Sequence, residues 1–212
     1  MRSFLKYVRS GVILTVLMLV VCGLVYPAAL TGLGQLLFPN QANGSLITAE
    51  GEKTTNPEEA VGSAIVGQDF SGDARYFQSR VSSVDYNTYD TAEEALNNVS
   101  SGNTNYGATN EELKTRVAED VQEFMGAHPG VKEGDIPADL LTASGSGLDP
   151  HISPESAEIQ IPAISEATGL SEEELQTIVD HNTEGKLLGI FGHERVNVLK
   201  CNLEIAAAIG EI

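Results

Sequence analysis

Charged residues are missing from one long stretch near the start of this 212-residue chain. No Asp, Glu, Lys or Arg occurs from Ser10 to Ala49, whereas the residues before it include Arg2, Lys6 and Arg9. At about 1.5 Å of rise per residue, a helix formed by the apolar first half of this stretch crosses a hydrocarbon layer roughly 30 Å thick. Because backbone groups in lipid must be paired within the segment, we predict a transmembrane helix over residues 11–31.

The cations around this helix predict its orientation. They all precede it, and the next charged residue is Glu50, so the positive-inside rule places residues 1–10 in the cytoplasm. Residues 32–57 are predicted to be a juxtamembrane segment and linker, because Asn, Gly, Thr and Pro are frequent in them. Residues 58–212 then form a single extracytoplasmic domain.

A cleaved signal peptide is the alternative interpretation of the N-terminal segment. The apolar run is longer than the usual core of a signal peptide, and residues 26–31 contain no clear A-x-A cleavage site. We therefore favour a retained anchor that makes the protein single-pass.

Cysteine and basic residues are scarce. Cys22 lies in the predicted span and Cys201 is the only cysteine beyond it, which excludes a disulfide between exported thiols and a cysteine-based zinc framework. Twelve Lys and Arg stand against thirty Asp and Glu, for a net charge of −18. Such a surface repels nucleic acid, so we expect no nucleic-acid partner, and it attracts cations. Solubility or a salty habitat explains the same acidity, and we favour that simpler interpretation.

Common catalytic motifs are also missing. The chain contains no G-x-x-x-x-G-K-[ST] phosphate loop, no G-x-S-x-G elbow and no H-E-x-x-H zinc pair. Residues 142–151 bring Thr, Ser, Gly, Asp and His into one loop, and Asp149 and His151 are possible ligands of one metal ion. Two ligands without a third make a weak metal site, so we predict a turn, no metal site and no catalytic residues.

The second half of the chain has clear helix signals. Thr109 to Glu112 reads as a capping box for a helix that Gly126 and Pro129 end. Ser153-Pro154 begins a second helix, which runs to Gly169 and is bent near Pro162 or has that residue near its start. Ser171 to Glu174 is another capping box.

The strand signals are shorter. Residues 60–66 are a possible strand, and residues 186–191 are predicted to form a buried strand. Residues 196–209 are ambiguous, since their start favours a strand and their end a helix. Residues 82–108 read as a long ordered loop, in which only residues 91–99 suit a short helix. We therefore predict an α+β fold: one transmembrane helix followed by a mixed α/β domain.

Two segments closely resemble one protein family. Residues 136–160 (IPADLLTASGSGLDPHISPESAEIQ) and 181–203 (HNTEGKLLGIFGHERVNVLKCNL) are similar to KdpC, the C subunit of the bacterial Kdp potassium-transporting P-type ATPase. The resemblance extends upstream through residues 62–103 and covers nearly the whole chain, including the single N-terminal membrane helix.

The resemblance implies an accessory subunit of an ATP-driven potassium uptake complex in the bacterial inner membrane. Its implied partners are a channel-like potassium-binding subunit and a pump subunit that hydrolyses ATP, so ATP and potassium enter at the level of the complex. The chain has no D-K-T-G-T phosphorylation motif, which agrees with a non-catalytic role. The loops at 82–108 and 142–151 supply our candidate partner contacts, namely Asn103, Ser144, Ser146, Asp149 and His151.

Two roles have been proposed for this family. In one, the subunit is a catalytic chaperone that raises ATP affinity through a glutamine corresponding to Gln160. In the other, the outer domain stabilises the assembly at the potassium entrance. Gln160 lies beyond a single span and no second apolar run of about 18 residues returns it to the cytoplasm. We therefore favour the second role. A membrane-anchored extracytoplasmic hydrolase and a solute-binding module remain the alternatives.

Overall fold

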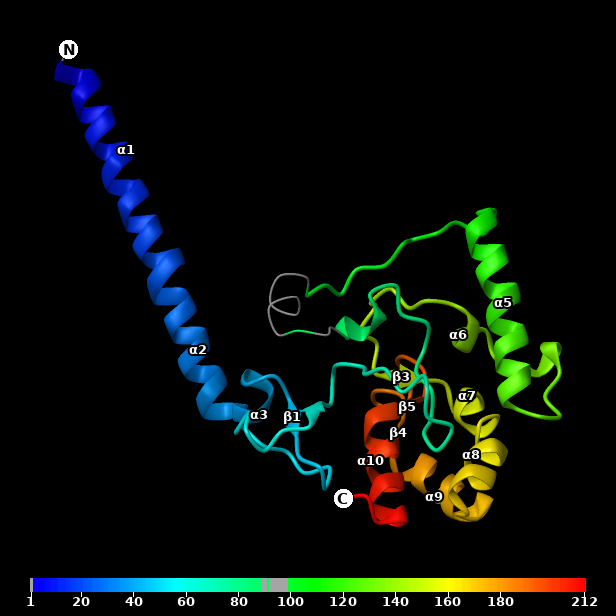
Figure 1. Cartoon of the computed structure of the whole chain (residues 1–212). Helices are drawn as coiled ribbons and strands as arrows, with labels where there is room; N and C mark the ends of the chain where they lie inside the picture. Colours follow the sequence, from blue (N-terminus) through cyan, green and yellow to red (C-terminus); the bar gives the residue numbers. More distant parts are fainter. Residues whose placement is uncertain (1, 89–90, 92–98) are drawn as a thin grey trace.

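The computed structural model describes residues 2–88, 91 and 99–212. Figure 1 shows a long N-terminal helix that stands away from a domain of helices and short strands. Helix α1 spans Arg2–Val20 and helix α2 spans Tyr26–Leu37, and a π-helical turn at Val21–Val25 joins them without a break. The predicted α+β fold, with one N-terminal apolar helix, is confirmed.

The joined helix is apolar on every side. Phe4–Leu37 has a mean hydropathy of 2.5 over its most apolar window, none of which is buried within the chain, and it is the one helix within the described ranges that is long and apolar enough to cross a membrane. A helix that is apolar all round needs lipid or partner helices around it. The π-helical turn ends two residues before Pro27, whose ring crowds the carbonyl four residues earlier. This wider turn accommodates that ring.

A short neck connects the helix to the domain. Helix α3, Pro39–Ala42, follows α2 with only Phe38 between them. The side-chain amide of Asn40 donates to the carbonyls of Leu46 at 3.0 Å and Thr54 at 2.9 Å, so α3 is tied to the chain that follows. The segment predicted to be a linker therefore contains ordered structure.

Two small antiparallel sheets follow. Strand β1, Leu46–Ile47, pairs with β2, Gly62–Ser63, which lies within the strand predicted at residues 60–66. The second sheet has the order β3-β5-β4. Its strands are β3 at His151–Ile152, β4 at Thr183–Glu184 and β5 at Arg195–Asn197.

The ambiguous segment at residues 196–209 contains both kinds of structure. Strand β5 ends at Asn197, and helix α10, Val198–Ile209, begins at once. The side-chain oxygen of Asn197 accepts a hydrogen bond from the Lys200 amide at 3.1 Å, which caps the helix. One residue thus ends the strand and starts the helix.

The predicted starts of two helices are confirmed. Ser153 caps α7, Pro154–Glu158, with proline in its first turn, and Ser171 and Glu174 form the reciprocal capping box of α9, Glu172–His181. The predicted helix from Ser153 is divided at Gln160, after which α8 spans Ile161–Thr168 with Pro162 in its first turn. The bend therefore lies where the proline predicted it.

Helix α5, Glu111–Ala127, ends before Pro129 as predicted but differs from the prediction at its start. Its cap is Asn110, whose side-chain oxygen accepts from the Leu113 amide at 3.0 Å, so the capping box that we predicted from Thr109 is wrong. Gly126 lies inside the last turn. Short helical turns follow at η3, Glu133–Asp135, and α6, Ala138–Leu141, and an earlier one, η2, spans Asp85–Asn87. The short helix predicted within residues 91–99 falls mostly outside the described residues.

The core lies where helices α7 to α10 pack on the three-stranded sheet. Helix α9 lies against α7, α8 and α10, and α5 packs against α6 at the edge of this group. Figure 1 shows α5 lying beside this group of helices. The largest fully buried apolar side chains of this core are Phe77, Ile164, Leu175, Val179, Val196, Val198 and Ile205.

The predicted buried strand at residues 186–191 is wrong. These residues form a tight turn closed by an antiparallel bridge between Leu187 and Phe191, and the side chains of Leu187, Leu188, Ile190 and Phe191, which we term the apolar tip, are exposed. Gly189 has a φ of 74°, a left-handed conformation that glycine adopts without strain, and it folds the run back on itself. A run this short and folded presents no face to the core.

Candidate functional site

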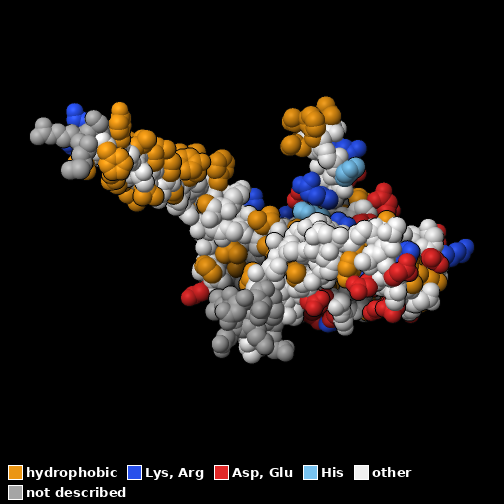
Figure 2. All heavy atoms as spheres, turned by 90° about the horizontal axis from the view of Figure 1, so that it is seen from above, with side chains coloured by type: hydrophobic (Ala, Val, Ile, Leu, Met, Phe, Trp, Pro, Cys, Tyr) orange, Lys and Arg blue, Asp and Glu red, His pale blue; other side chains and the backbone are white. Residues whose placement is uncertain are grey.

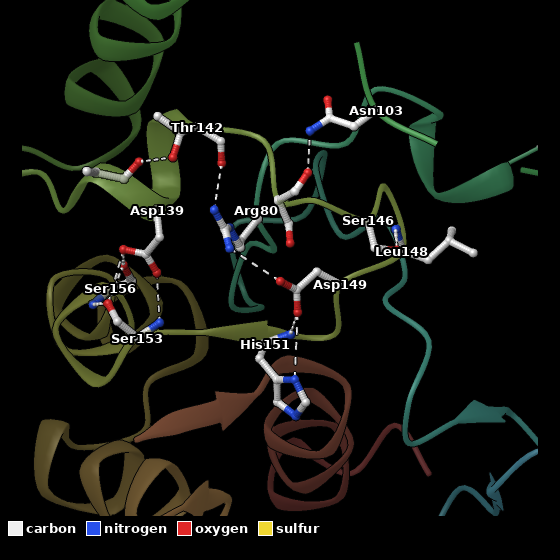
Figure 3. A network of polar contacts seen from close by, with 12 residues as sticks. Arg80, Asn103, Asp139, Thr142, Ser146, Leu148, Asp149, His151, Ser153 and Ser156 are labelled. Atoms are coloured by element: carbon white, nitrogen blue, oxygen red, sulfur yellow. Dashed lines mark hydrogen bonds and ion pairs between the residues drawn. The ribbon is translucent and has the colours of Figure 1, made fainter. Parts of the chain in front are cut away.

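The loop of residues 142–151 runs from the end of α6 to the first residue of β3, where segments far apart in the sequence meet (Figure 3). The Gly67 amide donates to the Leu148 carbonyl at 2.9 Å, and the Gly147 amide donates to the Ser101 carbonyl at 3.1 Å. The hydroxyl of Ser82 donates to the carbonyl of Gly147 at 2.7 Å. The loop is therefore held on two sides by backbone groups.

Two of these glycines are needed for the close approach. A Cβ on Gly147 would lie 2.5 Å from a methyl carbon of Val84 and 2.9 Å from the carbonyl oxygen of Gly102. A Cβ on Gly67 would lie 2.6 Å from the carbonyl oxygen of Asp149. Any larger residue at either position would push the segments apart.

Asp149 is the centre of the charged contacts in the loop. Its Oδ2 lies 3.3 Å from Nη1 of Arg80, and its Oδ1 accepts from the His151 amide at 3.0 Å, with the His151 ring nitrogen 3.7 Å away. Arg80 also donates to the Thr142 carbonyl at 3.2 Å. Burial disfavours the charged carboxylate, but hydrogen bonds from His151 and Ser144 and the charge of Arg80 outweigh it and lower the pKa of Asp149 to about 2.

A second carboxylate fixes the start of α7. Asp139, on α6, accepts hydrogen bonds from the Ser153 amide at 2.8 Å, the Ser153 hydroxyl at 3.1 Å and the Ser156 hydroxyl at 2.7 Å. Figure 3 shows these side chains converging beside the Arg80 and Asp149 pair. The loop is thus anchored to helices at both ends.

Gln160 and Asn202 hold the backbone of one buried segment. The Gln160 side chain is fully buried; its Oε1 accepts from the Gln78 amide at 2.7 Å and its Nε2 donates to the Ser156 carbonyl at 2.9 Å. Asn202 accepts from the Phe77 amide at 2.8 Å and donates to the Phe77 carbonyl at 3.0 Å. We term these two side chains the amide clamps.

The structure brings most of the predicted site residues together. Ser144, Ser146, Asp149 and His151 share the loop, and Asn103 joins it by donating to the Ser144 carbonyl. Gln160 lies apart from this group, among the contacts of its own clamp.

Sequence reasoning missed three residues that hold this region together, namely Arg80, Asp139 and Asn202. A signal existed for Arg80, because it is one of the few cations in an acidic domain and stands in a segment rich in serine. Asp139 and Asn202 carried no local signal, since their partners lie 14 and 125 residues away.

The loop does not form a catalytic triad. The Ser146 hydroxyl accepts from the Leu148 amide at 3.2 Å, and no dashed contact joins it to His151 in Figure 3. A nucleophilic serine needs its base within hydrogen-bond reach. In the part of the chain that the structure describes, no three His, Cys, Asp or Glu side chains lie close enough to hold a metal ion.

A cavity of about 570 Å³ lies beside Arg80, and none of the loop residues 142–151 lines it. It lies between α5 and the segment that follows β2. Tyr86 lines it, and its hydroxyl donates to the Arg80 carbonyl at 2.5 Å. Burial raises the pKa of Tyr86 to about 12, so this phenol stays protonated at neutral pH. The ionisable residues of the wall are mostly acidic: Asp69, Asp73, Asp85, Asp120 and Glu123, beside Arg80 and His128.

Comparisons with known proteins give one consistent family. The family model for the c chain of the K+-transporting ATPase, KdpC, matches residues 8–207. The potassium-transporting ATPase KdpC subunit of Clostridium kluyveri is 51% identical over 213 residues, which cover 99% of this chain and 98% of that protein. The KdpC subunit of Clostridioides difficile is 52% identical over 217 residues, covering 98% of this chain and 100% of that protein. The subunit of Caldanaerobacter subterraneus is 43% identical over 202 residues, or 95% of each chain.

Proposed function

The chain belongs to the KdpC family of potassium-transporting ATPase subunits, and from this premise we propose that it is a non-catalytic subunit that stabilises the complex at the extracytoplasmic potassium entrance. Its partners in this proposal are a channel-like subunit that binds potassium and a pump subunit that hydrolyses ATP. The helix at Phe4–Leu37 packs among lipids and partner helices, and the domain rests on the outer mouth of the channel-like subunit.

The observation that carries this proposal is the single apolar helix with cations only at its start. Lys6 and Arg9 precede the uncharged stretch, and the positive-inside rule then directs the N-terminus to the cytoplasm. Within the described residues no second helix of this kind returns the chain across the membrane. The acidic domain therefore belongs on the outer side of the cell membrane in our proposal.

The contacts of Gln160 support an assembly role over nucleotide binding. Its side chain is fully buried, and both ends of the amide already bind the backbone of Gln78 and Ser156. A nucleotide would have to displace these contacts and enter the core. ATP is also a cytoplasmic polyanion, and a strongly acidic domain disfavours it. We therefore propose that Gln160 stabilises the fold.

The loops at 82–108 and 142–151 are our proposed contact region with the channel-like subunit. The described parts of these loops form one surface, because Asn103 and Ser82 bind carbonyls at Ser144 and Gly147. Their mutual hydrogen bonds preorganise the surface, which lowers the entropic cost of docking. Residues 89–90 and 92–98 of this region lie outside the described residues.

Affinity purification tests the proposal directly. The full-length chain, tagged at its C-terminus, is recovered from membranes solubilised in mild detergent. We expect two larger membrane subunits to be recovered with it, together with ATPase activity that potassium stimulates. Recovery of the tagged chain alone would refute a role in assembly, and ester hydrolysis by that chain, lost on Ser146→Ala, would favour the hydrolase alternative.

Cysteine labelling tests the orientation. Cys22 lies in the apolar helix and Cys201 is fully buried, so Ile212→Cys adds one accessible thiol to the outer domain. In intact cells we expect a membrane-impermeant maleimide to label Ile212→Cys but not the parent chain. Labelling that appears only after lysis would place the domain in the cytoplasm and reverse the proposed topology.

A further inference from the structure

The apolar tip is the most exposed group of large apolar side chains on the outer domain. Leu187, Leu188, Ile190 and Phe191 are 69%, 81%, 75% and 63% exposed. Figure 2 shows an orange projection that rises clear of the domain, with blue and pale blue side chains at its base. Isolated exposed apolar residues are ordinary, but four on one short turn indicate a binding surface.

The turn that carries the tip is closed by its own backbone. The Leu187 amide donates to the Phe191 carbonyl at 2.8 Å, and the Phe191 amide donates back to the Leu187 carbonyl at 3.0 Å. Leu188 has a φ of 55°, a left-handed conformation that is unfavourable for a side chain with a Cβ. The strained residue is also the most exposed of the four, so its side chain contributes little to packing within this chain. Backbone strain of this kind persists only where the surrounding structure holds it, and here the hydrogen bonds of the turn do so.

The size of the tip limits what it can bind alone. Four side chains with these exposures present on the order of 400 Å² of apolar surface. A stable interface between free proteins buries about 800 Å² on each partner. Two copies of this chain that met tip to tip would fall well short of that area. A partner fixed in the same membrane requires less, because the anchoring helix raises the effective concentration of the domain.

The charges near the tip argue against a lipid surface. Arg195 is paired with Glu184 at 2.5 Å, and Glu194 is adjacent in sequence, so Lys186 and Arg195 do not form a net basic collar. Peripheral segments that insert into anionic bilayers combine apolar side chains with an excess of Lys and Arg. The whole chain carries a net charge of −18, which opposes approach to anionic headgroups.

From these observations we infer that the apolar tip docks into an apolar recess on the outer face of a partner subunit embedded in the same membrane. This inference rests on the proposed function and adds a second attachment point to it. The helix holds the chain within the membrane, and the tip fixes the position of the domain above the partner.

Variants of the full-length chain test the inference in the assembled complex. Phe191→Asp places a charge in the recess, and Leu188→Gly removes the most exposed side chain while relieving the left-handed strain. We expect each to lower recovery of the larger subunits by about tenfold at an unchanged level of the chain in the membrane. Ile65→Asp is the matched control, since Ile65 is 61% exposed and lies outside the tip, and we expect normal recovery. Equal recovery for tip and control variants, whether normal or lowered, would overturn the inference.

Photocrosslinking identifies what the tip contacts. Leu188→p-benzoylphenylalanine is irradiated in intact membranes that contain the complex. A crosslink to a larger membrane subunit supports the inference. Crosslinks to lipid alone, or to a second copy of this chain, would overturn it.

Recovery of the larger subunits with the unmodified chain distinguishes failure of the proposed function from failure of the inference about the tip. If the unmodified chain recovers no larger subunits, the proposed function fails. If it recovers them and the tip variants recover them equally well, the proposed function stands and the tip is not an attachment point.

Discussion

The amide clamps and the apolar tip differ in polarity, in burial and in the contacts that hold them. Gln160 and Asn202 are polar side chains placed inside the domain, and each binds the backbone of a segment far away in sequence. Leu188 and Phe191 are apolar side chains placed outside it, on a turn closed only by its own backbone. Polar side chains are usually exposed and large apolar side chains are usually buried, so both groups depart from the common pattern.

The clamps contribute to folding, whereas the tip contributes to association with another molecule. A buried amide is stable only when its hydrogen bonds are made, so the clamps join residues 77–78 to α10 and to the junction of α7 and α8. An exposed apolar tip gains nothing from folding and is favourable only when another surface covers it. We therefore expect clamp variants to lose stability, and tip variants to lose partners while the fold persists.

The largest effect on stability is expected for Gln160→Leu. Leucine leaves the Gln78 amide and the Ser156 carbonyl without their side-chain partner in the core, at a cost of about 3 kcal/mol. Denaturant unfolding of the full-length chain in detergent measures it. Gln176→Leu on α9 serves as control, because the half-buried Gln176 binds the side chain of Asp180 and no backbone in the core, and a loss of similar size there would contradict the clamp.

The low pKa of Asp149 predicts that the free energy of unfolding decreases in acid. Its folded pKa of about 2 lies below the value of 3.8 for an unperturbed Asp, so the unfolded state binds the proton first. The ionised Asp149 contributes roughly 2 kcal/mol to the free energy of unfolding. This contribution is complete above about pH 5 and is lost as the pH falls toward 2.

The measurement is the unfolding free energy as a function of pH for the parent chain and for Asp149→Asn. We expect the variant to be less stable at pH 7 and to lose less stability than the parent between pH 5 and pH 2. Ser71→Ala, at an exposed side chain that does not titrate, should keep the profile of the parent. Parallel profiles for Asp149→Asn and the parent would show that Arg80 and the loop do not stabilise this carboxylate.

A smaller loss is expected at a helix cap on the surface. Ser171→Ala removes the acceptor for the Glu174 amide at the start of α9 and should cost about 1 kcal/mol. The hydroxyl of Ser71 caps no helix, so Ser71→Ala should be neutral. Unfolding midpoints of the two variants compare them directly, and equal midpoints would show that the cap does not limit stability.

The smallest effect on stability is expected at the tip itself. Phe191→Asp should change the unfolding free energy by less than about 0.5 kcal/mol, because the side chain is exposed in the isolated chain. The same unfolding measurement checks it. A loss above about 1 kcal/mol would mean that the tip packs against its own domain, and the contrast with the clamps would disappear.

Local signals in the sequence predicted local structure well. The start of α7 at Ser153-Pro154 and the capping box of α9 at Ser171 are confirmed, since each depends on residues within one turn. The choice of Thr109 over Asn110 was wrong by one position, because adjacent Thr and Asn are both good caps and only the path of the chain decides between them.

Local sequence signals did not predict the contacts between distant segments. Gln78 and Gln160 are 82 residues apart, and no periodic pattern links them. The run at 186–191 has the composition of a buried strand, and periodicity alone does not distinguish a core strand from an exposed turn. The glycines at 185, 189 and 192 were the available sign that the run folds back on itself. Of the site, the loop residues were predicted as a group, whereas Asp139 and the pairing of Arg80 with Asp149 emerged only from the fold.

The neck has a mechanical consequence for the whole molecule. One non-helical residue, Phe38, separates α2 from α3, and the side-chain amides of Gln35 and Asn43 bind each other across that junction at 3.1 and 3.0 Å. Asn40 then fastens α3 to the first strand. These hydrogen bonds restrict the angle between α2 and α3, so a tilt imposed on the apolar helix by its surroundings is passed on to the start of the domain.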